Sequence, residues 1–189
     1  MKTYQTILMT GLIAGGIFSC TPKSTDTVES DNSAETVPVE TKDERPSPVV
    51  IEEGKIGGKD IKIHYGSPAV KGRTLWGDLV PYNIVWRTGA NEATYVDLSE
   101  DFIVEGNSIP AGKYSVFTIP KESGPWTVIF NSEWNLEHGH FQYDEKNDVL
   151  RVEVLPTWEG NSEERLSVKV ESPGIVIRWE KMKLPISMK

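Results

Sequence analysis

The stretch DVLRVEVL, Asp148 to Leu155, alternates apolar with charged residues at every second position. A period of two places the apolar side chains on one face of an extended strand and the charged side chains on the other. The stretch LSVKV, residues 166–170, repeats the pattern. Both stretches therefore predict strands with one buried and one solvated face, which is typical of an antiparallel sheet.

Similar runs recur along the chain at intervals of about ten residues, and Gly, Pro, Asn or Asp closes each of them. This spacing predicts an all-β domain, a single antiparallel β-sandwich of about 8–9 strands, either jelly-roll-like or immunoglobulin-like. A helical turn is expected in one stretch only, TLWGDLV at residues 74–80. The expected strands are DIKIHY (60–65), YNIVWR (82–87), EATYVDLS (92–99), DFIVEG (101–106), KYSVFTIP (113–120), WTVIFN (126–131), DVLRVEVL (148–155), RLSVKVE (165–171) and GIVIRWEK (174–181).

The N-terminus has the layout of a secretory signal. Lys2 is followed by an apolar run from Ile7 to Phe18, which is too short to span a bilayer as a helix. Cys20, the one cysteine of the sequence, comes directly after this region. We therefore expect a signal peptide at residues 1–19 and a lipid such as palmitate on Cys20, anchoring the protein to the outer membrane and facing the periplasm. The alternative is an ordinary signal peptide with an incidental thiol.

Residues 20–53 are rich in Thr, Ser, Pro and acidic residues, a composition that buries too little apolar surface to fold. We expect them to form a flexible acidic tether in front of a β-domain at residues 54–189. Residues 21–53 carry nine acidic and three basic residues, which leaves a net charge of −3 for residues 54–189. A mildly acidic domain without a basic stripe is not expected to bind nucleic acid.

The stretch VWRTGANEAT, Val85 to Thr94, allows two interpretations. In the first it is a hairpin with a four-residue loop at residues 88–91, which places Arg87 opposite Glu92 and Trp86 opposite Ala93. In the second, Arg87, Asn91 and Glu92 converge with Trp76 or Trp86 into a pocket for sugars or carboxylates.

The same region carries a family resemblance. The run SPAVKGRTLWGDLVPYNIVWRTGANEAT (67–94), followed by IPAGKYSVFTIP, WTVIFN and YDEKNDVLRVEV, resembles DUF2911, an uncharacterised family of exported Gram-negative proteins. The resemblance covers roughly residues 61–170 and implies a compact β-rich domain behind a signal or lipid anchor. It implies no catalytic residue.

Two of the three histidines are candidate metal ligands. His138 and His140, two positions apart, would point the same way on a strand and could hold a divalent metal with Asp144 or Glu137 as an oxygen ligand. The alternative is that they are ordinary surface residues of a loop. No H-E-x-x-H motif or cysteine partner supports the hypothesis of a metal site at His138 and His140. No cofactor is otherwise indicated. His64 alternates with Ile63 and Tyr65 and is expected on the solvent side of its strand.

Six tryptophans lie within the predicted domain. Trp86, Trp126 and Trp179 occupy strand patterns, where burial is the default. Trp134 and Trp158 lie in polar surroundings and are the expected exposed contacts for a ligand.

The sequence carries no G-x-S-x-G elbow, P-loop, G-x-G-x-x-G motif or cysteine nucleophile. We therefore expect a noncatalytic binding or scaffolding module for an envelope glycan or a partner protein. Its expected contacts are Trp134, Trp158 and the Arg87–Glu92 corner. The alternative is a small hydrolase or metal-dependent enzyme centred on Arg87, Asn91 and Glu92, with His138 and His140 as further candidates.

Overall fold

The computed structural model of the protein describes residues 45–189. The predicted signal peptide, Cys20 and most of the predicted tether lie outside the described residues. Within residues 45–189, no helix is long and apolar enough to cross a membrane.

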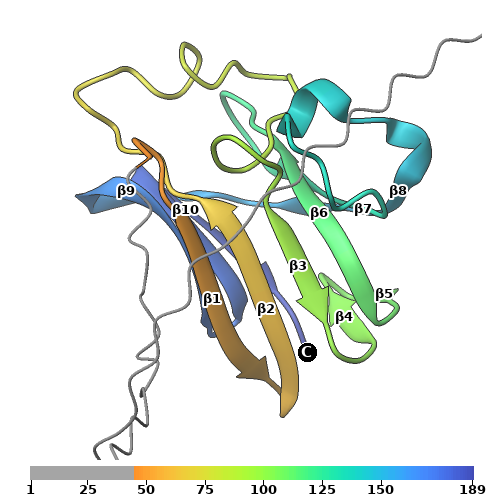
Figure 1. Cartoon of the computed structure of the whole chain (residues 1–189). Helices are drawn as coiled ribbons and strands as arrows, with labels where there is room; N and C mark the ends of the chain where they lie inside the picture. The colour runs from red at the N-terminus through yellow and green to blue at the C-terminus, as the bar shows by residue number, and fades with distance from the viewer. Residues whose placement is uncertain (1–44) are drawn as a thin grey trace, which may run out of the picture. The chain divides into compact units, whose positions relative to one another are not determined.

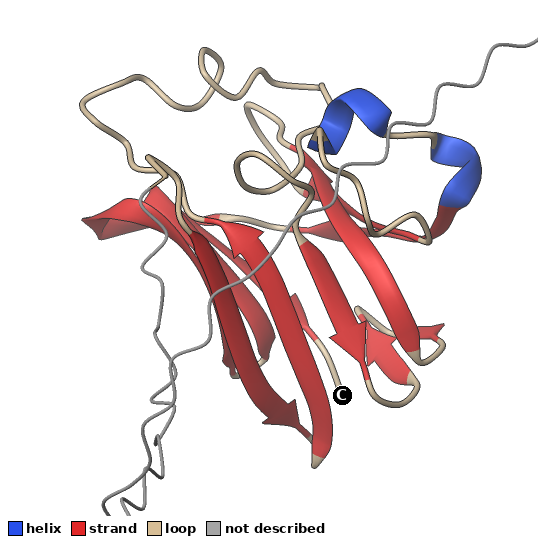
Figure 2. Ribbon diagram, in the orientation of Figure 1, coloured by secondary structure: helices blue, strands red, loops and turns tan. Residues whose placement is uncertain are grey.

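Ten strands form this part of the chain, and all of their pairings are antiparallel (Figures 1 and 2), which confirms the prediction of an all-β domain. Six of them make the main sheet in the order β1-β2-β3-β6-β7-β8, and two pairs make small sheets, β9 with β10 and β4 with β5. Two short 3-10 helices, η1 (Gly139–Gln142) and η2 (Glu145–Asn147), precede β8. The strands are β1 (Val49–Ile56), β2 (Lys59–Gly66), β3 (Tyr95–Leu98), β4 (Phe102–Val104), β5 (Asn107–Ile109), β6 (Gly112–Ile119), β7 (Trp126–Asn131), β8 (Asp148–Val154), β9 (Thr157–Glu171) and β10 (Gly174–Ser187).

Strand β8 has the two faces that its sequence predicts. Val152 and Val154 are buried, while Arg151 and Glu153 are exposed. The apolar side chains of β9 and β10 join the same buried cluster as those of β2, β3, β6, β7 and β8. The main core therefore combines side chains of the six-stranded sheet with those of the β9–β10 pair.

The centre of the main sheet is buried on both faces. Phe117 of β6 and Ile129 of β7 point away from the main core into a second cluster with Ala93 and Leu136. These last two residues belong to the long connections at residues 67–94 and 132–147, which gather at one end of the sheet, the upper end in Figure 1. The connections cover this part of the sheet and supply lining residues to two of the hollows described below.

Several sequence predictions need correction. Strand β1 begins at Val49, inside the segment predicted to be tether up to Glu53. The strand escapes prediction because it lies at the edge of the sheet and its residues are at most half-buried, which gives a weak apolar pattern. Strand β5 lies between the predicted strands at 101–106 and 113–120, where the sequence predicts none. The stretch 74–80 forms a tight loop closed by Val80 N–H to Leu75 O at 2.8 Å, and no helical turn.

The end of β2 touches the connection that follows it. A Cβ atom on Gly66 would lie 2.1 Å from the carbonyl oxygen of Ala90, and Ala90 N–H donates to Gly66 O at 3.3 Å. A side chain at position 66 would therefore push the Ala90 backbone away from the sheet.

We expect Gly66→Ala to lower the free energy of unfolding by about 1–3 kcal/mol or more, because backbone atoms must move to remove the overlap. Chemical denaturation followed by tryptophan fluorescence measures the change. Gly160→Ala is the matched control, since nothing lies within 4 Å of its Cβ position. Equal stability of the two variants would contradict the close approach.

Candidate functional site

The stretch around Trp86 does not form the predicted hairpin. Trp86 exchanges two backbone hydrogen bonds with Thr118 of β6, at 2.8 and 2.9 Å, and Tyr95 pairs with Ser115 of the same strand. The predicted partner of Trp86, Ala93, instead donates its N–H to Leu136 O. The YNIVWR stretch is thus a connection that pairs with β6 beyond the point where β3 begins, and the strand prediction for it is wrong.

Residues 87–94 form a loop whose shape depends on local backbone chemistry. Thr88 and Asn91 have positive φ angles of 56° and 65°. The Thr94 hydroxyl donates to Thr88 O at 2.9 Å, and a Cβ on Gly89 would lie 2.7 Å from that same hydroxyl oxygen. Gly89 therefore allows the loop to close tightly.

A cavity of about 300 Å³ lies beside this loop and is called the Arg87 cavity here. Arg87 and Arg73 line it together with His140 of η1 and the rings of Trp86 and Trp179. Of the described residues that line it, none is an Asp or Glu, although the whole chain has a net charge of −8. The remaining lining residues are Ser47, Pro68, Leu79, Val80, Gly89, Ala90 and Asn91.

Three of the lining residues have buried polar atoms without a hydrogen-bond partner. They are Arg87 Nε, His140 Nδ1 and Trp179 Nε1. Burial lowers the pKa of Arg87 and also that of His140, which the Arg87 charge lowers further. His140 is therefore neutral at pH 7, and one of its ring nitrogens donates while the other accepts. The N–H groups of Arg87 Nε and Trp179 Nε1 are donors without a partner at this cavity.

The position of Arg87 depends on Gly139. A Cβ atom on Gly139 would lie 2.3 Å from Arg87 Cδ, and Gly139 has a φ of 54°. The η1 segment can thus lie directly on the Arg87 side chain, which brings His140 to the same cavity.

Glu92 faces a different cavity from Arg87. Its Oε1 accepts from Arg45 Nη1 at 2.7 Å, so the predicted Arg87–Glu92 pair across a hairpin is replaced by an Arg45–Glu92 pair. The second cavity, called the His64 cavity, has a volume of about 180 Å³. It is lined by His64, Glu92, Ala93, Tyr95, Trp134, Asn135, Leu136 and Glu137.

Unpartnered polar atoms concentrate at these two cavities. Among the described residues, six side chains have a buried nitrogen or oxygen atom without a partner. Five of these side chains line one of the two cavities, and the sixth, Trp76, contacts the rings of Trp86 and Trp179. Because buried polar groups are normally satisfied, this concentration indicates positions that accept ligand atoms or water.

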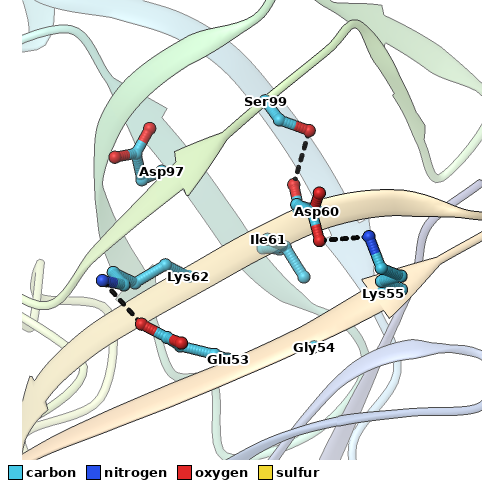
Figure 3. A pocket seen from close by; sticks show the side chains of 8 residues that line it. All are labelled: Glu53, Gly54, Lys55, Asp60, Ile61, Lys62, Asp97 and Ser99. Carbon is cyan, nitrogen blue, oxygen red and sulfur yellow. Dashed lines mark hydrogen bonds and ion pairs between the residues drawn. The ribbon is translucent and has the colours of Figure 1, made fainter.

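A hollow over the first two strands is a different kind of surface (Figure 3). It has a volume of about 510 Å³ and lies on β1, β2 and the end of β3. Its charged side chains already pair with one another, Lys62 with Glu53 at 2.6 Å and Lys55 with Asp60 at 2.5 Å. Asp97 pairs at 3.4 Å with Lys113, which does not line this hollow. A hollow whose charges pair with each other offers little to a ligand.

The predicted metal ligands do not converge. His138 and His140 lie at a 3-10 helix, where the alternation of a strand does not apply. Asp144 accepts from Lys146 N–H at the start of η2. Among residues 45–189, no three His, Cys, Asp or Glu side chains are arranged to hold a metal ion.

The two tryptophans expected as contacts differ in their surroundings. Trp134 lines the His64 cavity and lies 5.1 Å from the Tyr95 ring. Trp158 belongs to β9, is 53% exposed and touches the edge of Trp76, but it lines neither of the two cavities.

Sequence reasoning missed Arg73, Gly139 and Trp179 as contributors to the Arg87 cavity. Trp179 was read as a core residue, and its ring is indeed buried and stacked on Trp86 at 5.8 Å. A buried tryptophan that also borders a cavity gives no separate signal in the sequence. Gly139 lies between the two candidate histidines, and its contact with Arg87 comes from a segment distant in the sequence.

The fold and these cavities define a small antiparallel β-domain with a basic, tryptophan-walled hollow at one end of its main sheet. The chain belongs to the DUF2911 family, described as a protein of unknown function, whose family model matches residues 47–188. This confirms the family resemblance, and the match begins two residues before β1. Comparison with curated proteins and with solved structures gave no match.

We expect Gly139→Ala to destabilise the domain by more than Gly124→Ala. Both glycines have a positive φ, which costs a residue with a Cβ about 1–2 kcal/mol, but only at Gly139 would the new atom also overlap Arg87. Thermal and chemical denaturation of the two variants measure the difference. Equal losses would show that η1 does not lie on Arg87 as described.

Proposed function

We propose that the domain is a noncatalytic binding module whose Arg87 cavity takes a carboxylate-bearing ligand, with an acidic envelope glycan as the favoured class. The observation that carries this proposal is the set of buried, unpartnered N–H donors around a cavity lined by no Asp or Glu among the described residues. Arginine and the tryptophan N–H donate and never accept hydrogen bonds, so only an acceptor can satisfy them.

The walls of the cavity support a ligand that is partly apolar. Trp86 and Trp179 stack at 5.8 Å with nearly parallel rings, and Leu79 at the cavity is 43% exposed. A few polar groups on a largely apolar wall are typical of small-molecule sites. At about 300 Å³ the cavity stands at the lower end of the usual range of roughly 300–1,000 Å³, which suits a terminal group of a larger ligand.

The hydrolase alternative has less support. It combined Arg87, Asn91 and Glu92 into one centre, yet Glu92 pairs with Arg45 and lines the His64 cavity. Asn91 donates its side-chain N–H to Ser47 O at 3.1 Å and so has a structural partner. We therefore favour binding over catalysis.

Two further expectations from the sequence remain part of this proposal. The lipid on Cys20 would hold the domain at the outer membrane, facing the periplasm, through the acidic tether. The architecture would be a β-sandwich in which β9 and β10 form the second layer, a view supported by their shared core with the main sheet.

We expect Arg87→Ala to weaken binding of galacturonate or glucuronate by about tenfold to a hundredfold, since a hydrogen bond to a charged group contributes roughly 1.5–3 kcal/mol. Isothermal titration calorimetry of the full chain measures the affinity. Arg178→Ala is the matched control, because Arg178 is a similarly half-buried arginine on β10 that pairs with Glu171 away from the cavity. Unchanged uronate binding in Arg87→Ala, or no binding to the native chain, would overturn the proposal.

The pH dependence of binding offers a second test. Burial and Arg87 lower the pKa of His140, whereas a bound carboxylate would favour its protonated form and raise that pKa. Uronate affinity should therefore rise about threefold to tenfold as the pH falls from about 7.5 to about 5, before the ligand itself becomes protonated. His140→Gln should remove this dependence. A flat profile in the native chain would mean that His140 does not face the ligand.

A further inference from the structure

We propose that the His64 cavity is a second, separate binding site, and that it takes an uncharged ring bearing hydroxyl groups, such as a single pyranose unit. This inference does not rest on the proposed function of the Arg87 cavity, because the two cavities share no lining residue.

Three rings form one wall of the site. His64 of β2 and Tyr95 of β3 are direct cross-strand partners, and their rings stack at 4.9 Å with an interplanar angle of 15°. The Trp134 ring lies 5.1 Å from Tyr95. All three rings are partly exposed and lie over the outer face of the main sheet, opposite the main core. They offer an apolar surface on which the flat face of a ring can pack.

Two polar atoms at this wall lack partners. Glu92 Oε2 and His64 Nδ1 are buried and make no hydrogen bond. Burial alone would raise the pKa of Glu92, but hydrogen bonds from its own backbone N–H and from Arg45 outweigh this and hold the pKa below its usual range. Burial lowers the pKa of His64, so at neutral pH the pair is an ionised carboxylate beside a neutral imidazole. A carboxylate oxygen can only accept, so the ligand must bring donors, as hydroxyl groups do.

The surrounding charges argue against a charged ligand. Arg45 already neutralises Glu92 at 2.7 Å, and Lys113 lies over the Trp134 ring at 4.6 Å, so a cation would meet two resident cations. An anion would meet Glu92 and Glu137. An uncharged donor avoids both repulsions and still satisfies the two unpartnered atoms.

The size of the cavity limits what can enter. Its volume of about 180 Å³ is below the roughly 300–1,000 Å³ of pockets that bury larger ligands, so it admits one ring at a time. The segment Ala90–Ala93 separates it from the Arg87 cavity, because Ala90 and Asn91 line one cavity while Glu92 and Ala93 line the other.

Saturation-transfer difference NMR on the full chain, with the methyl glycosides of glucose, galactose and N-acetylglucosamine as probes, tests the proposal. At least one probe should receive saturation. Trp134→Ala should weaken its binding by about tenfold or more, because the ring loses its packing surface. His64→Phe keeps the stacked ring, removes Nδ1 and should weaken binding by about fivefold.

Trp158→Ala is the matched control, since it removes an exposed tryptophan that lines neither of the two cavities, and it should leave glycoside binding unchanged. Arg87→Ala should weaken uronate binding and leave glycoside binding unchanged, so failure of this inference can be distinguished from failure of the proposed function. No saturation with any glycoside, or equal signals in the native chain and in a folded His64→Phe variant, would overturn the proposal.

Discussion

The pairing of Trp86 with Thr118 is the constraint on which the arrangement of both cavities depends. Strand β3 begins at Tyr95, opposite Ser115 of β6, and Thr94 O accepts from Val116 N–H, so the edge of β6 beyond Val116 is open to another segment. The two hydrogen bonds between Trp86 and Thr118, one donated by each residue, occupy this edge and fix the direction in which the chain enters the loop at residues 87–94. Arg87 then follows immediately, beside the cavity, and the Trp86 ring packs on Trp179.

The loop that follows separates two regions of opposite chemical character. Its approach to Gly66 places Ala90 and Asn91 on the side of the two arginines, and Glu92 and Ala93 on the side of the aromatic wall. The segment before β1 reinforces this division, because Arg45 pairs with Glu92 while Ser47 O accepts from Asn91. A loop held at so many points keeps its polar side chains in place before a ligand arrives, which reduces the entropic cost of binding.

Unsatisfied polar groups usually cost about 1–3 kcal/mol each when buried, so a fold retains them where they serve a purpose or meet water. Elsewhere among the described residues, Trp76 Nε1 excepted, buried polar side chains have partners: Thr94 donates to Thr88 O, Ser115 to Glu133 O, and Asn131 to Asp144 O and Asp148. The contrast with the unpartnered atoms of the two cavities separates positions that stabilise the fold from positions suited to a ligand.

The sequence by itself determined the all-β class, the two-faced strands such as β8, and the family, because alternation and turn residues act over a few positions. It also drew attention to Arg87, Asn91, Glu92 and Trp134. Only the tertiary structure decided that Trp86 pairs with Thr118, thirty-two positions away, and that Glu92 pairs with Arg45. Local pattern cannot identify such partners, since strand pairing and ion pairing depend on which edges and charges the whole chain brings together.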